Sequence, residues 1–322
     1  MAGYTHALSG KHIKPGTFLY MISAQIITDS LNPTGDRLTT FILKFPRIVL
    51  AELNTHRAFS KNSASSRAIP FKKMLQKALE EPFIPMAFQK EHKGMQGLDY
   101  FEGEEKDQCV RDWLSARDSA VQAATSFKYK ITKQLANRLL EPFLMHTVIL
   151  SGTEFENFFA LRFHRDAEIH IADLAAKMLD EYNKSEPKLL NVGEWHVPFG
   201  DKIDADKLAG ALRSLNIINE VLDLENYVTF SKKIAVARCA RISYDNFEGK
   251  DDYEADIDLC DKLFGSIPRH LSPTEHVAQA MDESKFIGNF KGFKQYRKFF
   301  EGENATDVRV KKHDCSAINK KI

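Results

Sequence analysis

Cysteine is scarce in this sequence. Four residues in 322 are cysteine, no two of them are spaced CxxC, and no secretory signal precedes them. A disulfide framework and a zinc site are therefore not expected, and a reducing cytoplasm is the expected location. The four positions are Cys109, Cys239, Cys260 and Cys315.

Long apolar runs and an excess of one charge are also lacking. The apolar run from Thr17 to Ile27 is about 11 residues long, whereas a membrane span needs about 20. Lys and Arg number 45 against 44 Asp and Glu, so the net charge is only +1. We therefore expect no membrane span and no partner that is a polymeric nucleic acid, and any anion site must be local.

Composition predicts a soluble globular protein, since 43% of the residues are hydrophobic and 28% are charged. After an irregular lead-in over residues 1–37, the alternation in Leu38 to Phe45 predicts a buried strand. Apolar spacing then predicts helices. They cover Val121 to Leu139, Phe155 to Met178, Asp204 to Leu224 and Tyr253 to Phe264, and a second short strand is expected over Ile234 to Tyr244.

The stretch Thr55 to Arg67 has the composition of a phosphate-binding segment. Its thirteen positions include two arginines, a histidine, an asparagine and four serines. Hydroxyls and backbone N–H groups donate at short range, and Arg57 and Arg67 add charge-assisted contacts. The alternative is a solvated loop whose serines cap helices.

A second stretch, Leu150 to Glu168, contains an arginine beside an apolar stripe. Thr153 is expected to cap the helix that follows. Arg162 lies three residues after Phe159, so we expect it to be half-buried at the edge of the stripe. The alternative is a surface ion pair between Arg162 and Asp166 at helical spacing.

Four potential metal ligands follow Arg162, but no metal site is expected from them. Residues two apart on a helix point about 200° from each other, so these side chains would not converge. They are His164, Asp166, Glu168 and His170.

A third stretch, Val236 to Tyr244, places Cys239 between two arginines. Nearby cations lower the pKa of a thiol, so Cys239 is a candidate nucleophile, although a cysteine in an apolar run is more often a small core residue. Downstream, Ser272 to Glu275 has the pattern of a helix start with a capping acid.

Together these stretches resemble one family. The first stretch is similar to the Arg-His-Arg-x7-Ser signature of flavin-dependent thymidylate synthases, because it contains His56-Arg57 followed, after seven residues, by Ser65. The helix from Asn157 to Ile171 resembles the nucleotide-binding helix of that family, and Arg238 to Tyr244 and His270 to His276 resemble its RAARVSF and HxTPxEH elements. The resemblance covers about 150 residues. In the family the last two elements precede the signature, so their position here indicates a circular permutation.

The resemblance implies a role for each matching residue. Arg162 matches the arginine that ionises the pyrimidine, and His270 would lie near the flavin and the folate. The residues implied to bind the pyrimidine deoxynucleotide monophosphate are Glu52, Ser65, Arg67, Arg138 and Arg162. Those implied to bind FAD are His56, Arg57, Ser151, Thr153, Asn157, His270 and Ser272.

The sequence departs from the family pattern at four places. Thr55 replaces the first arginine of the signature, and Ser63 replaces its usual glutamate. Asp166 replaces a flavin-side histidine. Glu52 stands where a substrate-facing glutamine is usual, and a carboxylate that only accepts hydrogen bonds favours a base edge with an amino group, although uracil N3–H can also satisfy it.

The resemblance implies an α/β, flavin-dependent thymidylate synthase-like fold, a mixed sheet with long helices, in one elaborated catalytic domain over residues 1–322. Residues 38–186 would hold the signature and the nucleotide-binding helices, and residues 234–304 the permuted flavin and folate side. The implied enzyme is a homotetrameric, cytoplasmic flavoprotein. It methylates dUMP to dTMP with methylene tetrahydrofolate and NADPH. The alternatives are action on dCMP or another pyrimidine nucleotide, and a nucleotide-binding protein without catalysis.

Overall fold

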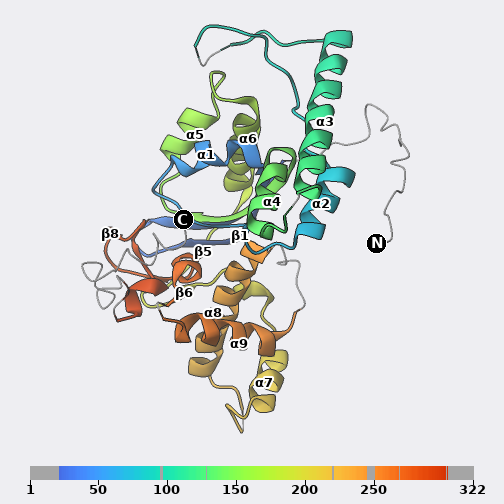
Figure 1. The fold of residues 1–322 in the computed structure, drawn as a ribbon. Helices are drawn as coiled ribbons and strands as arrows, with labels where there is room; N and C mark the ends of the chain where they lie inside the picture. The colour runs from blue at the N-terminus through green and yellow to red at the C-terminus, as the bar shows by residue number, and fades with distance from the viewer. Residues whose placement is uncertain are drawn as a thin grey trace, which may run out of the picture.

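The structure, a computed structural model, describes residues 22–94, 97–127, 129–219, 221–244, 251–267, 269–301 and 303. At its centre is a five-stranded mixed sheet of strand order β3-β4-β2-β1-β5 (Figure 1). Only β1 and β5 pair in parallel. The strands are β1 (Ser23–Leu31), β2 (Arg37–Pro46), β3 (Ser60–Ser63), β4 (Met145–Gly152) and β5 (Lys188–Leu189).

The two central strands, β2 and β4, are buried on both faces. Phe41 pairs with Leu150, and Ile42 pairs with Ile149. Because side chains alternate along a strand, the first pair enters one core and the second pair enters another. The strand predicted over Leu38 to Phe45 is therefore confirmed, and its continuous apolar run is explained by burial on both sides.

One face of the sheet is covered by α5 (Glu156–Arg162) and α6 (Ile169–Lys184). Leu174 and Met178 of α6 pack with Phe41 and Leu43 of the sheet. Phe155, just before α5, meets Phe41 edge-on at a ring-centroid distance of 5.5 Å. This layer is the largest core, and it fixes where Arg162 emerges at the end of α5.

The other face carries a helical layer of α7 (Ala205–Ser214), α8 (Leu224–Arg241) and α9 (Tyr253–Gly265), below the sheet in Figure 1. Cys239 and Ile242 pack under Ile42 and Ile149. Ala278 and Ala280 pack with Leu38 of β2. Parts of residues 234–281 thus pack on the strand at residues 38–45, while the permutation itself stays a prediction.

The other elements lie at the periphery. Short 3-10 helices are η1 (Arg47–Val49), η2 (Glu141–Phe143), η3 (Gly200–Lys202), η4 (Ile242–Tyr244), η5 (Ser272–His276) and η6 (Tyr296–Phe299). The remaining α-helices are α1 (Leu50–Asn54), α2 (Phe71–Glu80), α3 (Gly103–Thr125) and α4 (Lys133–Leu140). The small strands are β6 (Trp195–His196), β7 (Ala278–Ala280), β8 (Phe286–Ile287), β9 (Phe290–Lys291) and β10 (Phe293–Gln295). In the described residues no helix is long and apolar enough to span a membrane.

The strand predicted over Ile234 to Tyr244 is wrong, because this segment is the end of α8 followed by η4. Ile234, Ala235, Val236 and Ala237 are all buried. The sheet covers one side of this helix, and α9 and η5 cover other sides. Because apolar residues are therefore needed on several faces, the sequence does not show the helical periodicity of an amphipathic helix.

Three predicted helices are interrupted. The Val121 to Leu139 pattern breaks between α3 and α4, and the Phe155 to Met178 pattern breaks between α5 and α6. The helix predicted over Asp204 to Leu224 ends at Ser214, where Asn216 takes a left-handed φ of 54°. A residue in this conformation commonly ends a helix. The predicted Thr153 cap is also wrong, since α5 begins at Glu156 without a side-chain cap.

The irregular lead-in expected over residues 1–37 is wrong from Ser23 onward. Ser23–Leu31 is the strand β1, which pairs along its length with β2. Its register shifts between Ile26 and Thr28, and this irregularity interrupts the alternation that predicts a strand. Residues 1–21 lie outside the described part of the chain.

Candidate active site

The signature stretch Thr55 to Arg67 folds as a turn and then the edge strand β3. Ser60 pairs with Ser151 and Ser63 pairs with Val148 of β4. Successive side chains of a strand point to opposite faces. Lys61 accordingly contacts residues of the α5 side, whereas Asn62 contacts Ser272 of the α8 side. The edge strand therefore separates two groups of predicted site residues.

The first group, on the α5 side, joins Arg162, His56, Thr55 and Glu52, and we call it the arginine cluster. Arg162 Nε donates to His56 Nε2 at 2.9 Å across 106 residues of sequence. Its Nη2 donates to Thr55 Oγ1 at 3.0 Å and to the Glu52 carbonyl oxygen at 3.4 Å. The predicted alternative, an Arg162–Asp166 pair, is wrong, because Asp166 is paired with Arg165 and His164.

His56 is uncharged in the arginine cluster. Burial lowers the pKa of His56, and the positive charges of Arg162 and Lys61 lower it further. A neutral imidazole can accept through Nε2, as the bond from Arg162 requires. The ring also meets Phe158 edge-on at a centroid distance of 4.9 Å. His56 therefore orients the guanidinium without adding a charge to the site.

One charged residue, Lys61, borders the arginine cluster, and a second, Glu52, belongs to it. Lys61 Nζ donates to the carbonyl oxygens of His56 at 2.7 Å and Leu53 at 3.3 Å, and burial lowers the pKa of Lys61 to about 8. Glu52 Oε2 is buried and has no hydrogen-bond partner among the described residues. Because a buried oxygen without a partner is costly, this carboxylate is suited to receive a donor from a ligand.

The second group lines a cavity of about 370 Å³ on the α8 side of β3, which we call the edge cavity. Its wall includes two predicted site residues, His270 and Ser272. Ser65, a third, is tied to the wall because its backbone N–H donates to the Ser243 carbonyl oxygen at 3.0 Å. The other polar or charged lining residues are Asn62, Ser243, Tyr244, Arg269, Arg297 and Glu303.

Ser151 lies in a buried hydrogen-bond chain outside both groups. Its hydroxyl bonds to Thr40 Oγ1 at 2.7 Å and to His276 Nδ1 at 2.9 Å, and Thr40 bonds to His196. Burial lowers the pKa of both histidines to about 3, so both rings are neutral. The contact of Ser151 with a flavin stays a prediction, and in this arrangement its hydroxyl has two protein partners.

The remaining predicted residues lie at the surface or near it. Thr153 Oγ1 accepts the backbone N–H of Lys291 at 3.0 Å, which explains why it does not cap α5. The exposed residues are Arg57, Arg67, Arg138 and Asn157. Their side chains are available to a ligand, but the structure does not gather them around the edge cavity.

The four metal-ligand candidates after Arg162 are used in local contacts. Glu168 caps α6 by accepting the backbone N–H groups of His170 and Ile171. The His170 ring contacts the Glu168 carboxylate and accepts from the Met86 N–H at 3.0 Å. Within the described ranges no three His, Cys, Asp or Glu side chains come together in a way that could hold a metal ion.

Cys239 is not activated by its neighbouring arginines. Arg238 and Arg241 point to Asp256 on α9, while Cys239 is fully buried under the sheet. Burial raises the pKa of the thiol far above its ordinary value. Its interpretation as an activated thiolate is therefore wrong, and its interpretation as a small core residue is confirmed.

We expect Cys239→Ser to keep turnover per folded, flavin-loaded enzyme within about threefold of wild type, because an un-ionised buried thiol is no nucleophile. The measurement is steady-state product formation with flavin content checked by absorbance. Cys239→Ala is the matched control for packing. A Cys239→Ser protein with normal flavin and no turnover would contradict the expectation.

Arg269 and Arg297 of the edge cavity were not singled out from the sequence. Arg269 stands next to the predicted residue His270, and that adjacency was the available signal. Nothing in the sequence signalled Arg297, because its ion pairs with Glu275 and Glu303 depend on the fold. Arg269 has a single described contact, a 3.4 Å bond to the Glu301 carbonyl oxygen, so its charge is available to a ligand.

In a comparison with known proteins, one family model matches part of the chain. Residues 37–188 match the family model described as thymidylate synthase complementing protein. No curated protein matches the sequence. The matched segment contains the arginine cluster and β3, whereas most of the wall of the edge cavity lies outside it.

Two solved structures are similar in part. The UMP/dUMP methylase PolB from Streptomyces cacaoi, bound with 5-Br UMP, is 17% identical and has a TM-score of 0.42, over 51% of this chain and 89% of that chain. Thymidylate synthase X from Helicobacter pylori, with FAD and dUMP, is 18% identical and has a TM-score of 0.32, over 45% of this chain and 67% of that chain.

Proposed function

We propose that this chain is a member of the flavin-dependent thymidylate synthase family and that it methylates C5 of dUMP to give dTMP, since residues 37–188 match a model of that family. The proposed cofactor is FAD, and the proposed co-substrates are methylene tetrahydrofolate and NADPH. The observation that carries the proposal is the arginine cluster, in which Arg162 bonds to His56 and to the Glu52 carbonyl oxygen from a distant segment.

Arg162 is the residue proposed to activate the pyrimidine. C5 of uracil is a poor nucleophile, and a guanidinium at the N3 and carbonyl edge stabilises the anion whose charge spreads to C5. Arg162 is oriented by His56 and Thr55 through Nε and Nη2. Its Nη1 forms no hydrogen bond with the described residues, so that donor is available to the base. Such activation requires no enzyme thiol.

The phosphate of the nucleotide is proposed to contact Ser65, Arg67 and Arg138. Ser65 Oγ accepts the Arg67 N–H at 3.3 Å, which bends the chain after β3, and both arginines expose their guanidinium groups. Exposed arginines can form bidentate contacts with a phosphate. Because the net charge is only +1, this attraction must come from local residues.

The donors around the edge cavity fit part of an anionic, ring-bearing cofactor such as FAD. The volume of about 370 Å³ lies in the range of small-molecule sites and has room for a ring system but not for a whole dinucleotide. Ser272, Asn62 and His270 offer polar contacts at its wall. His56, Arg57 and Asn157 are proposed to hold the remainder, with Thr153 nearby. When bound, FAD would supply the hydride that reduces the transferred carbon.

Glu52 supports one alternative substrate. Its buried, unpartnered Oε2 can only accept hydrogen bonds when ionised, and cytosine presents an amino group where uracil presents a carbonyl oxygen. The same scaffold acting on dCMP or another amino pyrimidine is therefore the second candidate function.

A homotetramer in the cytoplasm remains a proposal that comes from the family resemblance alone.

The proposal is tested by incubating the purified protein with dUMP or dCMP, NADPH and methylene tetrahydrofolate, and by mass spectrometry of the nucleotide product. We expect a gain of one methyl group on dUMP and a yellow, flavin-containing protein. A yellow protein that modifies only dCMP would favour the second candidate. A colourless protein that binds nucleotide without product would support the non-catalytic alternative.

Arg269 is expected to contribute to FAD binding. Because a charge-assisted contact to an anionic group is typically worth about 1.5–3 kcal/mol, Arg269→Ala should weaken FAD binding by roughly tenfold or more in isothermal titration. Arg269→Lys should retain part of the affinity. Arg213→Ala, at an exposed position on α7, is the control. Equal losses in the Arg269 and Arg213 variants would show that only net charge matters.

A further inference from the structure

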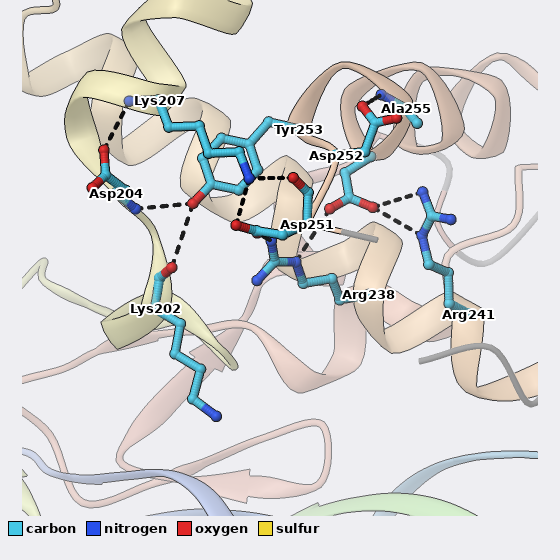
Figure 2. A network of polar contacts seen from close by, with 10 residues as sticks. Lys202, Asp204, Lys207, Arg238, Arg241, Asp251, Asp252, Tyr253 and Ala255 are labelled. Carbon is cyan, nitrogen blue, oxygen red and sulfur yellow. Dashed lines mark hydrogen bonds and ion pairs between the residues drawn. The ribbon is translucent and has the colours of Figure 1, made fainter. Parts of the chain in front are cut away.

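The buried carboxylate of Asp256 on α9 joins Arg238 and Arg241 at the end of α8, and Figure 2 labels these two arginines. Asp256 is 1% exposed. Its Oδ1 accepts from Arg241 Nε at 2.8 Å and Nη2 at 2.7 Å, and its Oδ2 accepts from Arg238 Nε at 3.2 Å. One carboxylate thus fixes both arginines of the last turn of α8, and we call this group the Asp256 clamp.

The start of α9 is itself held in place by α7. Arg238 Nη2 also donates to Asp251 Oδ1 at 2.6 Å, and Asp251 pairs with Lys207 of α7. The backbone N–H of Asp204 donates to the Tyr253 hydroxyl at 2.9 Å. Figure 2 shows these contacts converging from α7 and α9 on the end of α8. The helix that carries Asp256 is therefore held at its start by contacts with α7.

The end of α8 leads directly into the wall of the edge cavity. Ile242 is buried under the sheet, and Ser243 and Tyr244 line the cavity. The Ser243 carbonyl oxygen accepts the Ser65 N–H at 3.0 Å, so the signature segment is attached to the same short piece of chain. Thus one helical turn connects the Asp256 clamp with the cavity wall and with Ser65.

Stability alone does not account for such a clamp. A buried ion pair gains little over well-packed apolar residues of similar volume, because desolvation offsets the attraction between the charges. Burial raises the pKa of Asp256 although two arginines oppose that effect, so desolvation is substantial here. What the clamp does supply is directionality, since a carboxylate fixes two guanidinium groups in one geometry.

We propose that Asp256 is a positioning residue, which acts through Arg238, Arg241 and η4 to hold the wall of the edge cavity and the Ser65 segment in place. It does not itself contact ligand. The inference extends the proposed function, because the segment it positions is the one proposed to bind nucleotide and cofactor. The segment of α9 that carries it lies outside the family match.

Hydrogen exchange on the ligand-free protein tests the proposal without relying on activity. In Asp256→Asn, amide exchange in a peptide covering Ala64 to Arg67 is expected to be about tenfold faster or more, because the Ser65 N–H loses a fixed acceptor. Asp29→Asn is the matched control. The Asp29 side chain is 5% exposed and is bonded to an arginine, Arg37, but neither residue lines the cavity.

The expected result is faster exchange at Ala64 to Arg67 in Asp256→Asn and not in Asp29→Asn, at equal loss of thermal stability. Arg241→Gln, which leaves Asp256 bonded to Arg238, serves if Asp256→Asn does not fold, and it should show the same change to a smaller extent. Unchanged exchange in both clamp variants, or equal acceleration in the Asp29 control, would overturn the proposal.

A kinetic measurement then connects the clamp with the proposed function. If wild type makes product, Asp256→Asn should raise KM for nucleotide about tenfold with a smaller change in kcat, because the reacting groups of the arginine cluster are untouched. A drop in kcat alone would contradict positioning of the binding wall. If wild type makes no product, the proposed function fails, while the exchange experiment still decides the role of Asp256.

Discussion

Replacing Arg162 with alanine is expected to lower turnover of the pyrimidine nucleotide by roughly a hundredfold or more. Losing one donor that stabilises developing charge in a site shielded from water typically costs about 2.7–4 kcal/mol. The geometry supports such a role, since His56 accepts from Nε and leaves Nη1 free of contacts with the described residues. The measurement is steady-state product formation at saturating nucleotide, with flavin content determined for each preparation.

Two further variants make the Arg162 test specific. Arg162→Lys should recover only part of the turnover, because an ammonium group cannot address two edge atoms of the ring at once. Arg165→Ala removes an arginine whose side chain is 79% exposed and paired with Asp166, and it should stay near wild type. An active Arg162→Ala enzyme with normal flavin content would refute the assignment of Arg162 as the activating group.

Exchanging Glu52 for glutamine is expected to raise the preference for uracil over cytosine by about tenfold or more. A carboxylate repels the uracil carbonyl oxygens, whereas an amide can donate to O4 and accept from N3–H, and a good bidentate pair is worth about 1–3 kcal/mol of discrimination. The buried Oε2 lacks a partner among the described side chains, so the exchange disturbs no described contact at that atom. The measurement is the ratio of kcat/KM for dUMP and dCMP.

The control for this experiment is Glu105→Gln, which removes the same charge from an exposed position on α3. Its dUMP to dCMP ratio should match that of wild type. A ratio that does not change in Glu52→Gln would show that Glu52 does not face the base, and it would leave the cytosine alternative without structural support.

The edge cavity is built mainly by residues that lie far beyond the signature in sequence. Its wall comes from β3, the end of α8, the chain before and within η5, and residues near η6. In the described structure the segment predicted to be permuted therefore does lie against the signature segment, as the bonds of Asn62 to Ser272 and of Ser65 to Ser243 show. Whether the chain order arose by permutation stays a prediction.

Local patterns in the sequence were sufficient for some elements. The alternation in Leu38 to Phe45 predicted β2, and the apolar spacing in Tyr253 to Phe264 predicted α9, because each pattern depends on residues close in the chain. The content of Thr55 to Arg67 and the four blocks resembling the family also identified Arg162, His56 and Ser272 as candidates. These conclusions required no knowledge of which distant segments pack together.

Only the tertiary structure decided the environments on which the chemistry depends. Cys239 lies between two arginines in sequence, yet in space it faces the sheet while both arginines turn to Asp256. An Arg162–Asp166 pair was the alternative that the spacing in sequence offered, but Arg162 bonds to His56 instead. A charge or a thiol responds to what packs over it and to how much water it loses, and these are set by other elements of the fold that the local pattern does not reveal.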